Sequence, residues 1–442
     1  MANARRFQTR RLVHALVRHD IAMIDEPVRA QSISMVVGWL SAGMALIVAG
    51  VLALVVPPDT TGDAPIVMVR DSGALYVRVD HRLHPVANLA SARLVAHAPT
   101  NPVAVTAAAI AVADRGPALG ISGAPAHIGG TAHPTAWLVC DGDQTVVFAD
   151  PPVPVGGPVA PVLVTPAGES SGVTYLLYDG KRAAVDLRDL SAVRALRLDG
   201  VVARPISRVL LELLPQSADI AAPVIGGLGG PAPIGLSVGQ VLRLTRAGST
   251  EYYVALRQGL QRIGEVAADL IRFRYGIGGG DMPSVAPDVI ATAPVVNDLA
   301  VSDFPASSRT PIGGQAPKLC VQWHLDDSGS AVAEVRTDRP TTPATRSLAQ
   351  SDGSGPRIDA VALPGGQSIY ARAAGVGGDT TGGALYLIAD SGVRYGIHDE
   401  QAASYLGLAG PPVSAPWPLL AQLPQGPELS VESAELPRDS TV

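Results

Sequence analysis

The most uniform hydrophobic stretch of the chain runs from Ile33 to Val56 and contains 24 residues without a charge. As a helix it would be roughly 36 Å long, which is enough to cross a hydrocarbon core of about 30 Å. A cleaved signal peptide has a shorter apolar run, and a buried core helix has polar residues on one side. The pattern therefore predicts a transmembrane helix over 33–56.

The residues before this span predict an amphipathic helix within 1–29. Apolar residues recur every three or four positions between Leu12 and Ile24, with arginines on the other side, until Asp25-Glu26-Pro27 ends the pattern. Such a helix either lies on anionic lipid headgroups or docks a cytosolic partner, and the pattern fits both. As a docking helix, it would use Leu12, Leu16, Val17, Ile21, Arg11 and Arg18.

The charges on the two sides of the span predict its orientation. Residues 1–29 hold six arginines, whereas the first arginine after the span is Arg70. Positive residues favour the cytoplasmic side of a membrane. We therefore expect the N-terminus in the cytoplasm and residues 58–442 outside the inner (cytoplasmic) membrane.

Beyond the span, short apolar strands separated by glycines form one pattern four times. Each copy reads as a strand, a glycine turn, a strand with an aromatic residue, a third strand and a short helix. The second and fourth copies also share a Leu-Leu-x-x-Leu-Pro-Gln string that ends at Gln216 and at Gln425. The pattern predicts internal repeats, although ordinary hairpins followed by helices would look similar. The four repeats are expected at 64–119, 160–222, 235–275 and 366–429.

Two pieces lie between these repeats, 120–155 and 280–360, and each holds one of the two cysteines, Cys140 and Cys320. In an oxidising compartment an isolated pair is expected to form a disulfide, the alternative being two unrelated buried thiols. The predicted fold is α+β with a mostly β ectodomain, in which four small hairpin–helix repeats surround a central disulfide-linked domain. Residues 430–442 are expected to form a flexible tail.

Composition narrows the class of function. The chain of 442 residues is 47% hydrophobic and 16% charged, which is too apolar for intrinsic disorder. Its net charge of −6 gives no basic excess for nucleic-acid binding. Lysine occurs only at Lys181 and Lys318, against 31 arginines. This shortage argues against a mechanism that needs a lysine.

Several strings imitate catalytic motifs without their context. The segments 168–172 and 235–239 match the nucleophile-elbow string, but one falls in a hairpin turn and the other leads into a strand instead of a helix. Lys318 lacks the second glycine and the hydroxyl residue of a phosphate-binding loop, and Lys181 lies in a tight turn. We therefore expect no catalytic residue and no cofactor.

Metal binding is also not expected. The closest histidines beyond the span lack a carboxylate or thiolate at tight spacing, and the acidic pair after the first cysteine lacks the ligand series of a calcium loop. The residues considered are His81, His84, His97, His127, His133, Asp141 and Asp143.

Several stretches carry a resemblance to a known family. They are residues 11–18 (RLVHALVR), 25–27 (DEP), 74–77 (ALYV), 83–94 (LHPVANLASARL) and 123–125 (GAP), with Trp137 and the pair Cys140-Asp141. The run at 83–94 is long and specific. With its anchor, repeats and paired cysteines, the chain resembles EccB, the single-pass membrane component of the ESX type VII secretion systems of actinobacteria.

The resemblance implies a structural role. EccB proteins assemble with the ATPase EccC and with EccD and EccE in an inner-membrane complex, and their extracytoplasmic domains associate with one another near the mycosin protease. Their repeats have been likened to a phage-lysin wall-binding module, which implies peptidoglycan binding as an alternative function. Some family records call these proteins ATPases, a third alternative that the two lysines do not support.

Overall fold

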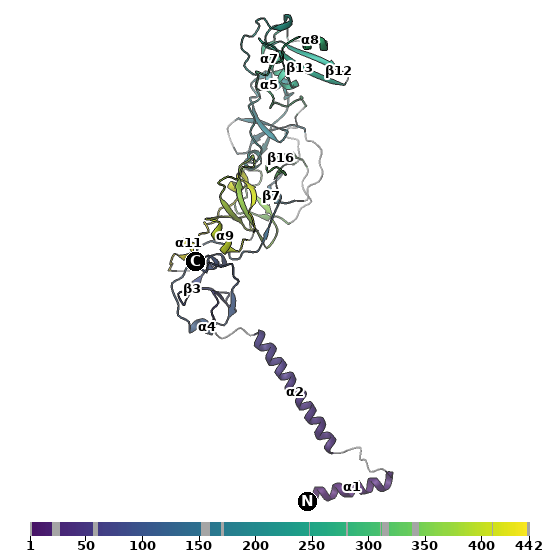
Figure 1. Ribbon diagram of the computed structural model, residues 1–442, viewed down its shortest axis with the longest axis vertical. Helices are drawn as coiled ribbons and strands as arrows, with labels where there is room; N and C mark the ends of the chain where they lie inside the picture. Colours follow the sequence, from purple (N-terminus) through teal and green to yellow (C-terminus); the bar gives the residue numbers. More distant parts are fainter. Residues whose placement is uncertain are drawn as a thin grey trace.

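The fold of the chain is taken from a computed structural model. It describes residues 2–19, 27–55, 61–151, 160–168, 172–246, 248–279, 282–309, 311, 318–337, 344–408 and 410–439. The molecule is of mixed α+β type and rich in sheet. Figure 1 shows a rod-like ectodomain, with the two N-terminal helices beyond one of its ends.

The N-terminal residues form two helices, α1 (Ala2–Arg18) and α2 (Pro27–Val55). Proline suits the first position of α2 because a first-turn N–H has no partner in the helix. Within α2, Ile33–Val51 is apolar and long enough to cross a membrane, and it is the one such helix in the described part of the chain. None of this segment is buried against the rest of the protein. This segment is the candidate membrane span of the described chain.

Three sheets of the ectodomain share one topology. In each, three antiparallel strands are followed by a short helix, and a fourth strand then pairs in parallel with the first. Sheet 1 contains β1 (Ile66–Val69), β2 (Leu75–Val79), β3 (Arg82–Val86), α3 (Leu89–Val95), β4 (Val103–Val105) and α4 (Ala107–Ala111). Sheet 2 contains β8 (Val162–Pro166), β9 (Thr174–Tyr178), β10 (Lys181–Val185), α5 (Leu190–Ala195), β11 (Arg204–Ile206) and α6 (Arg208–Glu212).

Sheet 4 has the same order and one further strand. It contains β19 (Gln367–Ala374), β20 (Leu385–Ile388), β21 (Arg394–Ile397), α9 (Glu400–Leu406), β22 (Val413–Pro416) and α10 (Trp417–Gln422). The added strand, β5 (Gly130–Ala132), pairs in parallel with β19. Apart from α10, which begins at Pro416, the short helices of these three sheets begin at polar N-caps, whose side chains accept hydrogen bonds from first-turn N–H groups. The N-caps are Asn88, Thr106, Asp189, Ser207 and Asp399.

Sheet 3 is a three-stranded variant. It contains β12 (Val241–Arg246), β13 (Ser249–Ala255) and β14 (Leu260–Ile263), followed by α7 (Glu265–Tyr275) and α8 (Pro287–Ala291). A turn of 3-10 helix, η1 (Pro233–Gly235), precedes it. In place of a fourth strand, Ser284 makes a single parallel bridge with Arg243 on β12.

The central sheet is built from two distant pieces of the chain. Its order is β16-β15-β6-β7-β18-β17. The strands are β6 (Ala136–Asp141), β7 (Thr145–Ala149), β15 (Leu319–Leu325), β16 (Ala331–Arg336), β17 (Arg346–Ser347) and β18 (Ala360–Ala362).

Shared cores fix the order of the sheets along the rod. Sheets 1 and 4 share one core, sheets 2 and 3 share a second, and one face of the central sheet packs on both sheet 2 and sheet 4. Strand β8 of sheet 2 shows why a strand can have several apolar residues in succession. Val162 and Val164 of β8 face the central sheet, whereas Leu163 between them faces sheet 3. Because strand side chains alternate, a strand with apolar neighbours on both faces has no polar positions.

Two predicted boundaries of the central domain were wrong. The central domain does not begin at 280, because 282–309 cover sheet 3, with Ile290 and Phe304 buried there. Likewise, residues 120–128 pack in the core of sheets 1 and 4, through Ile121 and Ile128, instead of in the central domain. Residues 282–309 contain four prolines, and 120–128 contain two glycines and one proline, but apolar side chains of both segments close the neighbouring cores.

The predicted flexible tail is also corrected. Ser430 caps helix α11 (Val431–Glu435), and Ala434 is fully buried beside α3. Further on, Arg438 donates its backbone N–H to Ala118 O at 2.8 Å and its side-chain Nε to Gly120 O at 2.6 Å. The segment is acidic but ordered through 439, because it closes the core of sheets 1 and 4.

Candidate functional site

The disulfide lies at the centre of the ectodomain. Cys140 on β6 and Cys320 on β15 are directly opposed in the antiparallel ladder, and their sulfur atoms are bonded at 2.03 Å. Both residues are buried, at 3% and 0% exposure. The bond joins residues 180 apart in the sequence, so it fastens the two pieces of the central sheet to each other.

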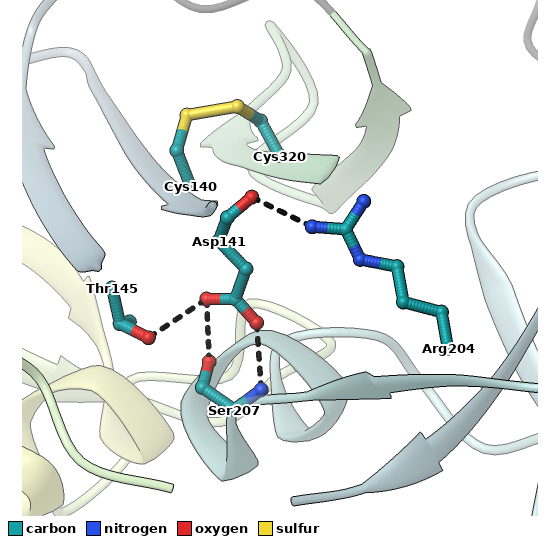
Figure 2. The surroundings of a disulfide bond; sticks show 6 residues. All are labelled: Cys140, Asp141, Thr145, Arg204, Ser207 and Cys320. Atoms are coloured by element: carbon teal, nitrogen blue, oxygen red, sulfur yellow. Dashed lines mark hydrogen bonds between the residues drawn. A yellow bond between two sulfur atoms is a disulfide. The ribbon is translucent and has the colours of Figure 1, made fainter. Parts of the chain in front are cut away.

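The residue after the first cysteine, Asp141, anchors the central sheet to sheet 2 (Figure 2). Its carboxylate accepts hydrogen bonds from the Ser207 backbone N–H at 2.6 Å, from Ser207 Oγ at 2.8 Å and from Thr145 Oγ1 at 3.0 Å. Arg204 Nη2 donates to the backbone oxygen of Asp141 at 3.0 Å. Asp141 thus holds two elements of sheet 2. Its backbone oxygen binds Arg204 of β11, and its carboxylate binds Ser207 at the start of α6.

Burial dominates the titration of Asp141. Only 6% of the residue is exposed, and this burial raises the pKa of the carboxyl above its ordinary value of 3.8. The hydrogen bonds from Ser207 and Thr145 and the charge of Arg204 act in the opposite direction, but they do not cancel the effect on the pKa.

A second buried carboxylate, Asp359, lies on the other side of Thr145. Its Oδ2 accepts the Thr145 backbone N–H at 2.7 Å, while Oδ1 accepts Ser351 Oγ and the N–H groups of Asp352 and Gly353, each at 2.7 Å. Burial opposes ionisation here as well, but the hydrogen bonds outweigh it and lower the pKa of Asp359. Thr145 therefore links the two carboxylates through its hydroxyl and its N–H.

This arrangement is suited to holding parts together. Ser207 Oγ donates to Asp141 and also caps α6 by accepting the Leu210 N–H at 3.4 Å, so its hydroxyl serves the fold. Each carboxylate receives several donors from separate segments, which fixes those segments at defined positions. The site is a staple between the central sheet, sheet 2 and the loop at 351–353.

The sequence pointed to the cysteines of this site but not to its acids. Asp141 was considered only as a calcium ligand, and Asp359 was not considered. Ser207 is 66 residues from Asp141, and nothing local connects the two. The position of Asp141 directly after a buried cysteine was the one available signal.

The predicted docking residues lie on α1, at the N-terminal end of the molecule and away from the disulfide. On α1, Leu12, Leu16 and Val17 are 64%, 77% and 74% exposed. Arg11 is on the same helix, which ends at Arg18. Ile21 and the predicted break at 25–26 are outside the described residues. The structure therefore presents an exposed apolar surface on α1.

The residues examined for chemistry lie apart from one another. Lys181 begins β10 and pairs with Asp303 at 3.8 Å, and Lys318 immediately precedes β15. The second nucleophile-like string leads through Gly239 into β12, whereas most of the first is outside the described residues. In the described ranges, no group of three or more His, Cys, Asp or Glu residues is placed to hold a metal ion.

Comparison with known proteins identifies the family. The family model for "Type VII secretion system ESX-1, transport TM domain B" matches residues 1–442. The chain belongs to the EccB family. Its relatives include the ESX-3 secretion system ATPase EccB3 of Mycolicibacterium smegmatis, which is 33% identical over 463 residues, covering 98% of this chain and 89% of the relative. The ESX-2 secretion system ATPase EccB2 of Mycobacterium tuberculosis is 33% identical over 470 residues, covering 98% and 93%.

Solved EccB structures share the fold. A chain of the intact ESX-5 inner membrane complex matches with a TM-score of 0.73 and 29% identity, over 99% of this chain and 95% of that one. The EccB3 dimer from the ESX-3 core complex matches with a TM-score of 0.72 and 32% identity, over 84% of this chain and all of the other. The family expected from residues 11–18 and 83–94 is confirmed.

Proposed function

We propose that this chain is the membrane-anchored EccB scaffold of a type VII secretion inner-membrane complex. One observation carries the proposal: the similarity to a chain of the ESX-5 inner membrane complex extends over 99% of the residues, so it includes the anchor as well as the ectodomain. A protein that shared only an ectodomain fold would not have this extent of similarity.

The N-terminus lies in the cytoplasm and the ectodomain on the far side of the inner membrane. The six arginines within residues 1–29 support this orientation, because positive residues accumulate on the cytoplasmic side. The disulfide between Cys140 and Cys320 also supports it, since structural disulfides persist in oxidising compartments outside the cytosol.

Two surfaces of the chain, one on α1 and one on the ectodomain, mediate assembly of the secretion complex. The exposed apolar residues of α1 dock EccC, EccD or EccE-like components, and the ectodomain associates with a second copy and lies near the mycosin protease. Support for self-association comes from the relative EccB3, whose structure is described as a dimer. Support for docking comes from Leu12 and Leu16, which a helix in water would bury if it could.

The ectodomain arose from four copies of one hairpin–helix unit. Sheets 1, 2 and 4 share strand order and the parallel fourth strand. Sheets 2 and 4 also agree in detail: Arg182 N–H donates to Pro215 O at 3.0 Å, and Arg394 N–H donates to Pro424 O at 2.9 Å. These contacts fall in the two Leu-Leu-x-x-Leu-Pro-Gln strings. Sheet 3 with its α7 is the most divergent copy.

The role is structural and not hydrolytic, although relatives carry the word ATPase in their names. The lysine that a phosphate loop needs must follow a glycine-rich turn and open a helix. Lys318 opens a strand, and Lys181 follows a two-residue hairpin turn. ATP hydrolysis by the purified full chain and by a Lys318→Ala variant should therefore be equal and at background.

Affinity purification of the full chain in mild detergent tests the proposal. Recovery of EccC- and EccD-like proteins with the chain supports the scaffold. A chain recovered alone, which instead sediments with purified cell wall, would replace the scaffold by a peptidoglycan-binding module. Deleting residues 1–29 should abolish recovery of the partners while the ectodomain still folds, and unchanged recovery would remove the docking role from α1.

A further inference from the structure

A groove of about 600 Å³ opens on sheet 4, at the corner where β20, β21 and the start of α9 meet. Its lining is mixed, and its charged and polar side chains come from four separate segments of the chain. They include Arg372, Tyr386, Arg394, His398, Glu400 and Glu428. The assembly role proposed above does not use the groove.

Most charges in the groove are already paired. Arg372 Nη2 donates to Glu400 Oε1 at 2.8 Å, and His398 Nδ1 lies 3.1 Å from Glu428 Oε1. The remaining acid of the lining, Asp399, accepts the Ala402 N–H at 2.7 Å as the N-cap of α9. These pairs leave Arg394 as the cation of the groove that has no acidic partner among the described residues.

Arg394 is buried although its charge is not neutralised. Only 8% of the residue is exposed, and its guanidinium lies 5.5 Å from the ring centroid of Tyr386 and 5.7 Å from that of Trp417. Its side chain makes one hydrogen bond, from Nη2 to Gln425 Oε1 at 3.2 Å, and its Nε is buried without a partner in the described structure. A buried unpaired donor is costly, and an ionised one more so.

The corresponding arginine of sheet 2, Arg182, has a different hydrogen-bond acceptor. Arg182 lies 5.8 Å from the ring centroid of Tyr175, as Arg394 lies over Tyr386, but its Nη1 donates to Leu211 O at 3.0 Å at the end of α6. Arg394 makes no such bond to α10. Both arginines have a buried Nε without a partner in the described structure, so what sets Arg394 apart is its place in the groove, beside two rings and one amide.

We propose that this groove binds a carboxylate of an acidic peptide segment, with Arg394 as the anchoring residue. A guanidinium offers paired N–H donors that match the two oxygens of a carboxylate, and the flanking rings hold it in position. A glycan would need many free donors and acceptors for its hydroxyl groups, but those of Arg372, His398, Glu400 and Glu428 are paired with one another. The unpaired N–H donors of Arg394 fit one anionic group.

Fluorescence polarisation with the full chain in detergent tests this assignment. The probe is a short fluorescein-labelled peptide of alternating serine and glutamate, and its control replaces each glutamate by glutamine. We expect saturable binding of the glutamate peptide that is about tenfold or more tighter than that of the glutamine peptide. Equal binding of both peptides, or saturable binding of a neutral chitooligosaccharide in place of the peptide, would overturn the proposal.

Two variants and a matched control locate the site. Arg394→Gln should weaken binding of the glutamate peptide by about tenfold or more, whereas Arg182→Gln at the corresponding position of sheet 2 should leave it unchanged. If Arg394→Gln fails to fold, Gly396→Leu replaces it as the test. A Cβ at Gly396, which lines the groove, meets only Glu428 Cγ at 3.9 Å, so the leucine obstructs the groove and leaves Arg394 in place. Unchanged binding in the folded variants, or an equal loss in Arg182→Gln, would refute the site.

Discussion

Arg93 and Leu406 are 313 residues apart in the sequence, yet Arg93 Nη1 donates a 2.7 Å hydrogen bond to the backbone carbonyl of Leu406. The guanidinium also donates from Nε to Thr100 O at 3.3 Å and from Nη2 to Asn101 Oδ1 at 2.9 Å. Arg93 is 8% exposed, and burial lowers its pKa. One side chain thus joins α3 of sheet 1 to the end of α9 of sheet 4, the junction nearest the membrane anchor (Figure 1).

Replacing this arginine should loosen that junction. Arg93→Met keeps the length of the side chain but leaves the carbonyl of Leu406 without its donor, and we expect the free energy of unfolding to fall by about 3 kcal/mol. Thermal unfolding measures the loss, and hydrogen exchange should increase first in α3 and α9. The control is Arg188→Met, because Arg188 is exposed and pairs only with its neighbour Asp186. Equal effects of the two variants would contradict the role of Arg93.

The two carboxylates of the staple should give stability opposite dependences on pH. Asp141 has a raised pKa, so the folded state holds its proton to higher pH than the unfolded state does. Its contribution is complete below the unfolded pKa, about 3.8, and is lost as pH rises through the folded value. Asp359 has a lowered pKa, so its contribution is present above that unfolded value and is lost as pH falls through the folded one.

Urea unfolding between pH 3 and pH 7 (roughly the carboxyl range) measures this difference. Relative to Asp141→Asn, the parent chain should become less stable as pH rises above the ordinary carboxyl pKa. Relative to Asp359→Asn, it should lose stability as pH falls below that pKa and show no further change above it. Each variant is the control of the other, and parallel curves for the two would show that the buried carboxylates titrate alike.

The strands of sheet 1 show which elements can be predicted from the local sequence. The strand expected at the start of the repeat at 64–119 is present as β1, because an apolar run bounded by a glycine turn has few other solutions. Helix α11 was missed for the opposite reason. Its two apolar residues, Val431 and Ala434, form no recognisable period in an acidic segment, and only the surface of α3 gives them a place to be buried. Sequence patterns predict elements that are stable through local periodicity, and they miss those that depend on a distant partner.

The same limit applies to the staple and to the groove. The cysteines could be paired because there are only two, but the partner of Asp141 could have been any polar residue of the chain. The groove on sheet 4 depends on Gln425 and Arg394, which are 31 residues apart and are brought together by the segment after α10. Only the sheet topology makes such residues neighbours.

Removing the disulfide should lower stability without changing the topology. The chain-entropy model gives at most about 5 kcal/mol for a loop of this length, since the bond restricts the unfolded chain. We expect Cys140→Ala/Cys320→Ala to unfold at lower temperature than the parent, and a reducing agent to affect the parent but not the variant. Thiol titration of the native parent should find no free thiol. Two thiols titrating in the native protein would contradict the bond.

A pair of glycines separates backbone strain from close packing. Gly180 and Gly200 both have positive φ, +71° and +73°, so alanine is strained by about 1 kcal/mol at either position. A Cβ at Gly180 would lie 2.2 Å from Ala333 O of the central sheet, whereas at Gly200 it would meet open space. Gly180→Ala should therefore cost about 1–3 kcal/mol more than Gly200→Ala in chemical denaturation. Equal costs would mean that β9 and β10 do not approach the edge strand β16 so closely.

The docking role of α1 can be tested without touching the ectodomain. Replacing Leu12 and Leu16 by serine removes two exposed apolar side chains one helical turn apart, and recovery of partner proteins in detergent should fall several-fold. Ala4→Ser/Gln8→Ser is the matched control, with the same spacing and two serines on α1, and it should recover partners as the parent does. The melting temperature of the ectodomain should be unchanged in both variants, because its cores begin beyond the anchor, at Ile66. If the leucine variant recovers partners normally but a peptide of residues 2–19 binds anionic vesicles, then α1 is a membrane-surface helix and not a docking helix.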